Sequence, residues 1–268
     1  GSIDTLMLST VGDDKVGAVG AANTYLGVFT ISFSVISTGV MAVMTQYIGA
    51  GKNGVARQAR NIGVIFNGII GGVFSILLLF WSSPILKVLG TADSLLPYAT
   101  TYMRIVGGTS ILTALTPIVT SYLRAFGFTK EPLITNVTAN VLNIILNSIF
   151  LFVYDWGVAG VAIATAISRG VGLLMGIIMC IRKIKIPKDA ETISNVTVCK
   201  NILRVGVPSA LESALYNVAM AIVMKFLNEM SDDGIYVTAK SYASQITMFS
   251  YCAGVALANA NAIIVGWR

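Results

Sequence analysis

The chain has 268 residues, of which 55% are hydrophobic and only 11% are charged, and its mean hydropathy is +0.80. Soluble domains carry about 25% charged residues, so this composition excludes a water-facing surface over most of the molecule and predicts an integral membrane protein. The formal net charge of +6 reflects basic residues in the loops of one side. We therefore expect contact with membrane lipid and no nucleic-acid partner.

Long apolar stretches alternate with short polar ones along the whole chain, and none shows the two-residue alternation of a strand. A transmembrane helix needs roughly 20 apolar residues to cross about 30 Å of hydrocarbon. The sequence predicts an all-α bundle of transmembrane helices. It contains the end of a first helix at 3–12 and full spans at about 16–48, 61–83, 96–125, 132–154, 157–181, 206–230 and 235–266.

The loop charges predict the orientation of these spans. Segments 52–60 and 182–204 carry an excess of Lys and Arg, and an even number of spans separates them. Because cytoplasmic loops are enriched in basic residues, both segments should be cytoplasmic. Segments 12–15 and 231–234, which carry paired aspartates, should be external. We expect a multi-pass protein of a cell membrane of the bacterial inner-membrane type.

An internal repeat predicts how the spans are grouped. Similar segments, 11–14 and 230–233, open the external loops before the second and eighth spans, and six helices separate equivalent points. Parallel repeats of this kind build some transporters, and a second six-helix copy would give a parent protein of about twelve helices. We therefore interpret the chain as a fragment with three parts: a first lobe at 1–181, a cytoplasmic linker at 182–204 and the start of a second lobe at 205–268.

The fifth span carries four asparagines on one face. Asn136, Asn140, Asn143 and Asn147 follow the spacing i, i+4, i+7 and i+11, which places them within an arc of about 60° on a helix. Unpaired amides are costly in hydrocarbon, so this face should meet protein or water. One interpretation is interhelical hydrogen bonding, worth about 0.6 kcal/mol per contact. The favoured one is a polar wall of a central cavity, because four aligned amides exceed what packing requires.

Asp4 and Glu212 are acids placed well inside predicted spans of a chain that has no histidine. Asp4 is expected roughly 13 Å below the external surface, and Asn147 roughly 12 Å below it, from the helical rise. We expect these two residues to share one site. An intramembrane carboxylate indicates a functional site by default, and a structural ion pair is the alternative interpretation.

Glu212 is the second intramembrane acid. It follows Pro208, which should bend or break its helix, and Tyr216 lies one turn further and could donate a hydrogen bond to it. Pro117 should similarly kink the fourth span. The ion-pair partners considered for either acid are Arg104, Arg169 and Lys225.

Nothing in the sequence indicates enzymatic chemistry or a cofactor. Cys180, Cys199 and Cys252 are scattered, and they match neither a disulfide framework nor a metal-binding pattern. Without histidine there is no zinc-protease motif, and no paired aspartates lie on facing helices. We expect neither an enzyme nor a firm metal site.

Several short motifs, in their order and spacing, resemble the multidrug and toxic compound extrusion (MATE) family of transporters. They lie at 3–7, 44–51, 122–127, 143–147, 157–165, 206–212 and 259–266. The resemblance implies two six-helix lobes around a central cleft and export of organic cations or drugs in exchange for H⁺ or Na⁺. The family's first-helix acid matches Asp4. Its fifth-helix pattern Asn-x-x-x-Asp matches Asn143 but departs at position 147.

An asparagine at position 147 cannot carry a proton or a charge. The resemblance therefore implies that coupling depends on Asp4, with Asn143, Asn147 and Thr165 as neutral ligands or hydrogen-bond partners. Asn140, Glu212 and Tyr216 are further candidates for contact with substrate or coupling ion. The alternative function is a flippase for lipid-linked saccharides with the same overall architecture, which a groove dominated by arginines such as Arg104 and Arg169 would favour.

Overall fold

The computed structural model describes residues 4, 7–8, 13–89, 91, 93–187, 190–229 and 235–267. Within these ranges all regular structure is helical and no strand occurs, which confirms the predicted fold class. Of the segments expected to be external, residue 12 and residues 231–234 lie outside the described residues, whereas residues 13–15 form the start of α2.

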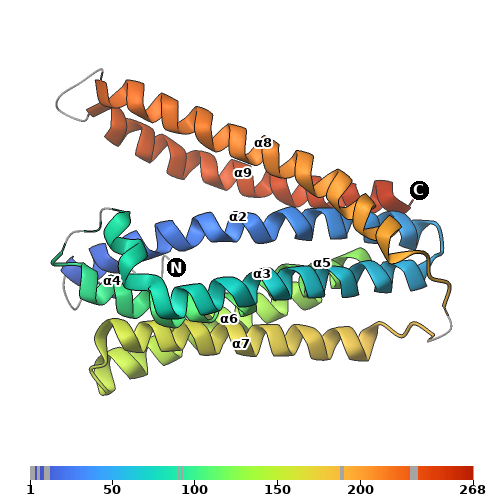
Figure 1. Cartoon of the computed structure of the whole chain (residues 1–268), viewed down its shortest axis with the longest axis horizontal. Helices are drawn as coiled ribbons and strands as arrows, with labels where there is room; N and C mark the ends of the chain where they lie inside the picture. The colour runs from blue at the N-terminus through green and yellow to red at the C-terminus, as the bar shows by residue number, and fades with distance from the viewer. Residues whose placement is uncertain are drawn as a thin grey trace.

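Each predicted span from residue 16 onward corresponds to one helix or to a helix with a local irregularity (Figure 1). The elements are α2 (Asp13–Gly49), α3 (Asn53–Val88), α4 (Leu96–Tyr102), the π-helical turn η1 (Met103–Gly107), α5 (Ser110–Ala125), α6 (Lys130–Ser148), the π-helical turn η2 (Ile149–Val153), α7 (Gly157–Lys183), α8 (Asn195–Glu229) and α9 (Ile235–Trp267).

Several helices are longer than their predicted spans. α3 has 36 residues and α8 has 35, whereas roughly 20 cross the hydrocarbon. By length and apolar composition, α3, α7 and α6 with η2 could each cross a membrane, and two bent pairs raise the count to five among the described residues. α9 contributes a shorter apolar helix at Ser250–Gly266.

The bend of the fourth span is not at Pro117. Leu96–Gly107 and Ser110–Ala125 meet at 44°, whereas α5 runs through Pro117. Side chains compensate the interrupted backbone at the bend, because the Ser110 hydroxyl donates to the Gly107 carbonyl and the Ile111 N–H donates to Ser75 Oγ. α8 similarly continues through Pro208 without a break.

The loops at 50–52, 126–129 and 184–194 lie at one end of the bundle, which we call the basic end (Figure 1). One apolar cluster near that end includes Val40, Val55, Ile118 and Ile202. A second cluster, toward the opposite end, is formed by other residues of α2, α3, α4 and α7.

Buried Asn67 links three helices in the middle of the bundle by hydrogen bonds. Its Nδ2 donates to the carbonyl oxygens of Phe33 and Ala114 and to Ser37 Oγ, at 2.9–3.3 Å. These contacts join α2, α3 and α5.

The helices α8 and α9 approach α2 toward the basic end and diverge from it toward the opposite end (Figure 1). Three glycines permit the close approach. A Cβ at Gly39 would clash with the Ile202 carbonyl oxygen, and one at Gly206 would clash with that of Val35. A Cβ at Gly266 would lie 2.7 Å from Thr45 Cβ. The bundle is therefore packed backbone against backbone at its basic end.

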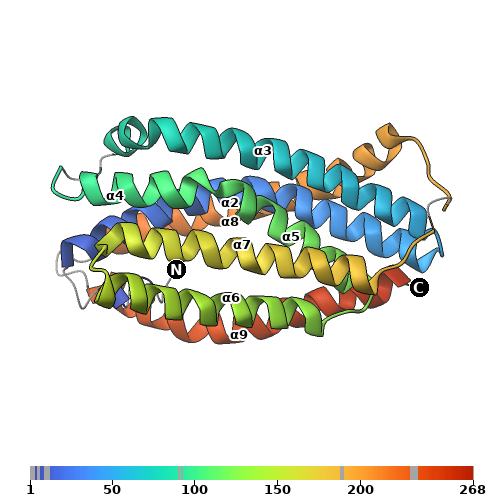
Figure 2. The same cartoon turned by 90° about the horizontal axis from the view of Figure 1, so that it is seen from below.

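Figure 2 shows α6 and α7 side by side, and the two helices are in extensive contact. This pair carries the residues of the site described below.

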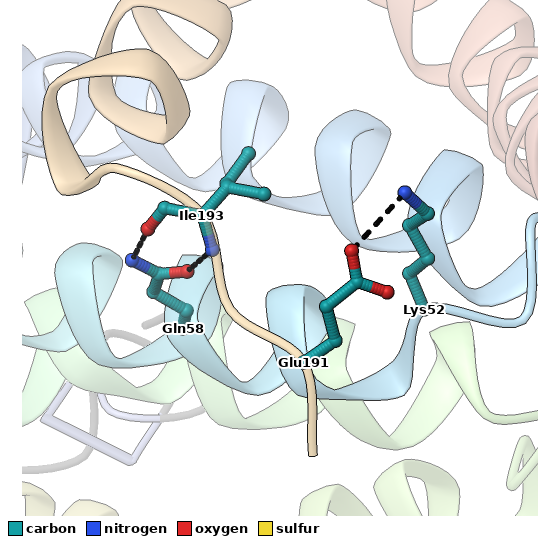
Figure 3. A network of polar contacts seen from close by, with 4 residues as sticks. All are labelled: Lys52, Gln58, Glu191 and Ile193. Carbon is teal, nitrogen blue, oxygen red and sulfur yellow. Dashed lines mark hydrogen bonds and ion pairs between the residues drawn. The ribbon is translucent and has the colours of Figure 1, made fainter.

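The linker between α7 and α8 is fastened along the first turns of α3 (Figure 3). Gln58 pairs with the Ile193 backbone, donating to its carbonyl at 2.7 Å and accepting from its N–H at 3.2 Å. Lys52 and Glu191 form an exposed ion pair at 3.5 Å. Arg57 donates to the Pro187 carbonyl at 2.8 Å.

Gln58→Ala should release this linker. It removes two hydrogen bonds to the Ile193 backbone and a contact with Asn195 Oδ1. The two backbone bonds alone, at about 1 kcal/mol each, should make the open form at least roughly 30-fold more populated. We expect trypsin to cleave after Lys185 correspondingly faster in limited proteolysis of the purified protein. Gln46→Ala, at an exposed position near the end of α2, is the matched control. Equal cleavage rates in the two variants would show that Gln58 does not hold the linker.

Candidate functional site

The centre of the candidate site is the carboxyl group of Asp4, a helical residue whose exposed fraction is only 2%. Asn147 Nδ2 donates to Asp4 Oδ1 at 2.8 Å. Thr165 Oγ1 lies 3.3 Å from Asp4 Oδ2. The two residues expected at matching depth therefore do meet.

Two further hydrogen bonds close these contacts into a ring. Asn147 Nδ2 donates to Asn143 Oδ1, and Asn143 Nδ2 donates to Thr165 Oγ1, each at 3.3 Å. Asn143, Asn147 and Thr165 are all buried. We call these three residues and Asp4 the Asp4 ring.

Sequence features of α6 and α7 bring the ring together. Asn143 and Asn147 are one turn apart on α6, so their side chains project to the same face. Gly160 allows α7 to pack closely on η2, since a Cβ there would lie 2.8 Å from Phe150 Cβ. Thr165 follows little more than one turn later on α7 and reaches the asparagines.

The Thr165 hydroxyl has two acceptors within reach. The Val161 carbonyl lies at 2.9 Å and Asp4 Oδ2 at 3.3 Å. Because a threonine hydroxyl has one proton to donate, it can serve its own helix or the Asp4 carboxyl group, but not both at once.

One atom of the ring has an unused hydrogen-bonding capacity. Asn147 is fully buried, and its Oδ1 has no hydrogen-bond partner among the described residues. A buried acceptor without a partner costs about 1–3 kcal/mol. This oxygen can therefore receive a proton donor or a cation beside Asp4.

Tyr102 is a neighbour of the ring that the sequence reasoning missed. It is fully buried on α4, and its hydroxyl donates to Asn23 Oδ1 at 3.3 Å. It also lies close enough to interact with Thr165 and with the charges of Asp4 and Arg169. The signal available in the sequence was a tyrosine, with its polar hydroxyl group, inside the otherwise apolar fourth span.

Asn140 lies outside the Asp4 ring. The expectation that it faces the interior is wrong, because Asn140 is exposed, as is Asn136. At this level α6 packs on α7 through a neighbouring face, where a Cβ at Gly172 would lie 3.1 Å from Ala139 Cβ. Only further along α6 does the asparagine face turn into the contact with α7.

Glu212 and Tyr216 are on α8, outside the Asp4 ring. Glu212 is exposed and Tyr216 has an exposed fraction of 61%. No hydrogen bond joins these two described residues. Arg169, considered as a partner of either acid, donates to Thr113 Oγ1 at 3.1 Å.

Comparison with known proteins identifies the family to which this chain belongs. The sequence profile of the MatE family matches residues 1–149. The chain is 31% identical over 272 residues to an uncharacterised transporter, YisQ, of Bacillus subtilis, covering 99% of this chain and 59% of that protein. It is 28% identical over 235 residues to the multidrug export protein MepA of Staphylococcus saprophyticus, covering 85% of this chain and 51% of that protein.

The fold agrees with these sequence matches. An outward-facing structure of a multidrug resistance MATE family transporter of the MOP superfamily superposes with a TM-score of 0.86 at 22% identity, over 99% of this chain and 60% of that chain. The chain therefore spans somewhat more than half the length of the proteins it matches. On the profile match, the relatives and the fold together, the chain belongs to the MATE family of membrane transporters.

Proposed function

We propose that this chain forms most of the first lobe and the first helices of the second lobe of a proton-coupled exporter of organic cations and drugs. The division into a lobe at 1–181, a linker at 182–204 and a second lobe from 205 remains part of this proposal. The observation that carries the proposed coupling is the buried Asp4 carboxyl group, which contacts the polar side chains of Asn147 and Thr165.

Several findings support the export function. The MepA relative is a multidrug export protein, and the structural neighbour is a multidrug resistance transporter. By the positive-inside rule, the basic loops support a cytoplasmic location for the basic end, in a bacterial plasma membrane. α8 and α9 close on α2 at that end and diverge toward the other, which is the arrangement of a transporter open to the outside.

The proposed coupling follows from the two states of Asp4. When Asp4 is protonated, it donates to Thr165, accepts from Asn147 and places no charge in the interior. When the proton leaves, the buried carboxylate is costly unless water or a cation reaches it. Protonation therefore favours one arrangement of the helices and ionisation the other, because only a difference in binding free energy can shift such an equilibrium. An organic cation would leave on the outside as Asp4 becomes neutral.

Sodium is the second candidate coupling ion, and the unpartnered Asn147 Oδ1 favours it. Hard cations choose carboxylate and carbonyl oxygens. Asp4 and Asn147 would supply such ligands, with Asn143 and Thr165 adjacent. Glu212, Tyr216 and Asn140 remain candidates for substrate contact on exposed surfaces.

The saccharide flippase is less well supported. Arg169 makes a hydrogen bond with Thr113, and Arg104 is exposed. The buried ionisable group at the ring is the acid Asp4, which suits a cation rather than an anionic lipid-linked sugar.

The experiment that tests the proposal is export by the complete transporter in liposomes with H⁺ and Na⁺ gradients imposed separately. Ethidium serves as a fluorescent organic cation. We expect an inward H⁺ gradient to drive export and a Na⁺ gradient at equal pH to have no effect. Export under Na⁺ alone would establish the sodium alternative, and export under neither would contradict ion-coupled export.

Thr165→Val should slow this export about tenfold, whereas Thr165→Ser should leave it within roughly twofold. Valine retains the shape but removes the hydroxyl that contacts Asp4 Oδ2, a loss of about 1.5 kcal/mol for a hydrogen bond to an ionisable group. Thr120→Val is the control, because Thr120 is also buried and donates only to its own helix. Initial export rates at a fixed gradient measure the effect, and equal rates for the two valine variants would remove Thr165 from the mechanism.

A further inference from the structure

A groove of about 780 Å³ lies between α3 and α8 at the basic end of the bundle. Its apolar wall includes Ile62 and Phe66 of α3 and Leu203 of α8, and its polar rim includes Lys200 and Arg204. We call it the basic groove. It is separate from the Asp4 ring, which is formed by Asp4 together with α6 and α7.

The two cations of the basic groove are placed to act together. Lys200 and Arg204 are one turn apart on α8, so their side chains project to the same face. Both are exposed. The groove lining contains no acidic side chain, and neither cation forms an ion pair within the part of the chain that the structure describes. Their charge is therefore uncompensated.

The basic groove lies within the first four turns of α3 and of α8, counted from the basic end. Arg204 is nine residues beyond the first residue of α8, which corresponds to about 13 Å along the helix. Phe66 is 13 residues beyond the first residue of α3, which corresponds to about 20 Å along that helix from the same end. Phe66 and Leu203 are 40% and 42% exposed, so the apolar wall is open to the surrounding membrane.

We propose that the basic groove binds one anionic phospholipid of the leaflet at the basic end. The phosphate lies between Lys200 and Arg204, where the guanidinium group can donate two parallel hydrogen bonds to it. The first acyl chain lies along Ile62, Phe66 and Leu203. Two positive charges select an anionic over a zwitterionic headgroup, and the apolar wall selects a lipid over a free anion.

Native mass spectrometry of the purified chain, released from micelles with equimolar phosphatidylglycerol and phosphatidylcholine, tests this proposal. A basic residue at an anionic lipid surface contributes roughly fivefold in affinity, so Lys200→Gln with Arg204→Gln should reduce phosphatidylglycerol retention about 25-fold. Arg182→Gln with Lys185→Gln removes the same charge from exposed positions outside the groove. This control should retain phosphatidylglycerol within twofold of the unaltered chain. Equal retention of the two lipids, or equal losses in the two double variants, would overturn the proposal.

Cys199 gives an independent readout because it lines the basic groove and is partly exposed. In a Cys252→Ser background, with Cys180 buried, its reaction rate with a maleimide reports occupancy of the groove. We expect phosphatidylglycerol to slow the reaction at least fivefold, and glycerol phosphate at the same concentration to leave it unchanged. Equal protection by glycerol phosphate would identify a site for free anions and contradict a lipid site.

Discussion

Asp4→Asn in the complete transporter should reduce gradient-driven export of ethidium to the rate of protein-free liposomes. Asparagine has the size of the neutral carboxylic acid but cannot exchange a proton, so the Asp4 ring stays in one charge state. Without a change of charge at residue 4, the ion gradient no longer shifts the equilibrium between the two helix arrangements. Initial export rates under an imposed H⁺ gradient measure this loss.

Ethidium binding should fall much less than transport in the same variant. The through-space attraction between one carboxylate and a bound cation is on the order of 1 kcal/mol at an effective dielectric constant of 20, so affinity should fall roughly tenfold or less. Asp155→Asn is the matched control, because Asp155 is exposed and has a φ of 52°, a conformation that asparagine adopts readily. If Asp4→Asn exports at the parental rate under both H⁺ and Na⁺ gradients, Asp4 is structural and Glu212 becomes the leading candidate.

Gly39→Val should shift the complete transporter away from the arrangement closed at the basic end. The new side chain would clash with the Ile202 backbone, which cannot yield as a flexible side chain can. Overpacking of this kind costs up to about 3 kcal/mol, equivalent to more than a hundredfold in the equilibrium between two arrangements. Export should fall because one of the two arrangements required for alternating access is disfavoured.

Distances between spin labels near the basic ends of α2 and α8 measure this shift directly. We expect a longer distance in Gly39→Val than in the parent. Gly20→Val has the same helix-propensity cost on the same helix, and its Cβ would meet nothing within 4 Å. An unchanged distance distribution in Gly39→Val would show that the glycine contacts do not control closure.

The sequence predicted the helices well because a transmembrane span has a strong local signal, a long apolar run. It missed the first turns of α8, because Asn195 to Arg204 lie outside the apolar run. Val198 and Ile202 of these turns are nevertheless buried against the rest of the bundle. The bend of the fourth span was placed at Pro117, whereas it lies between Gly107 and Ser110, where side chains of two helices satisfy the freed backbone groups.

The Asp4 ring was predicted in part. Helical periodicity and the expected depth in the membrane predicted that Asp4, Asn143 and Asn147 share one site. The family resemblance predicted that Thr165 belongs to it. Periodicity also included Asn140 incorrectly, because a helical wheel gives the direction of a side chain but not the level at which a neighbouring helix covers it. Tyr102 was missed because its approach to the ring depends on how α4 packs against α7.

Proton release on substrate binding tests the central claim most directly. Ethidium is added to the detergent-solubilised complete transporter in a weakly buffered solution, and the pH change is recorded for the parent and for Asp4→Asn. If Asp4 holds the coupling proton, the parent releases protons as ethidium binds and the variant binds ethidium without releasing any. Equal proton release from both proteins would show that the coupling proton is held elsewhere.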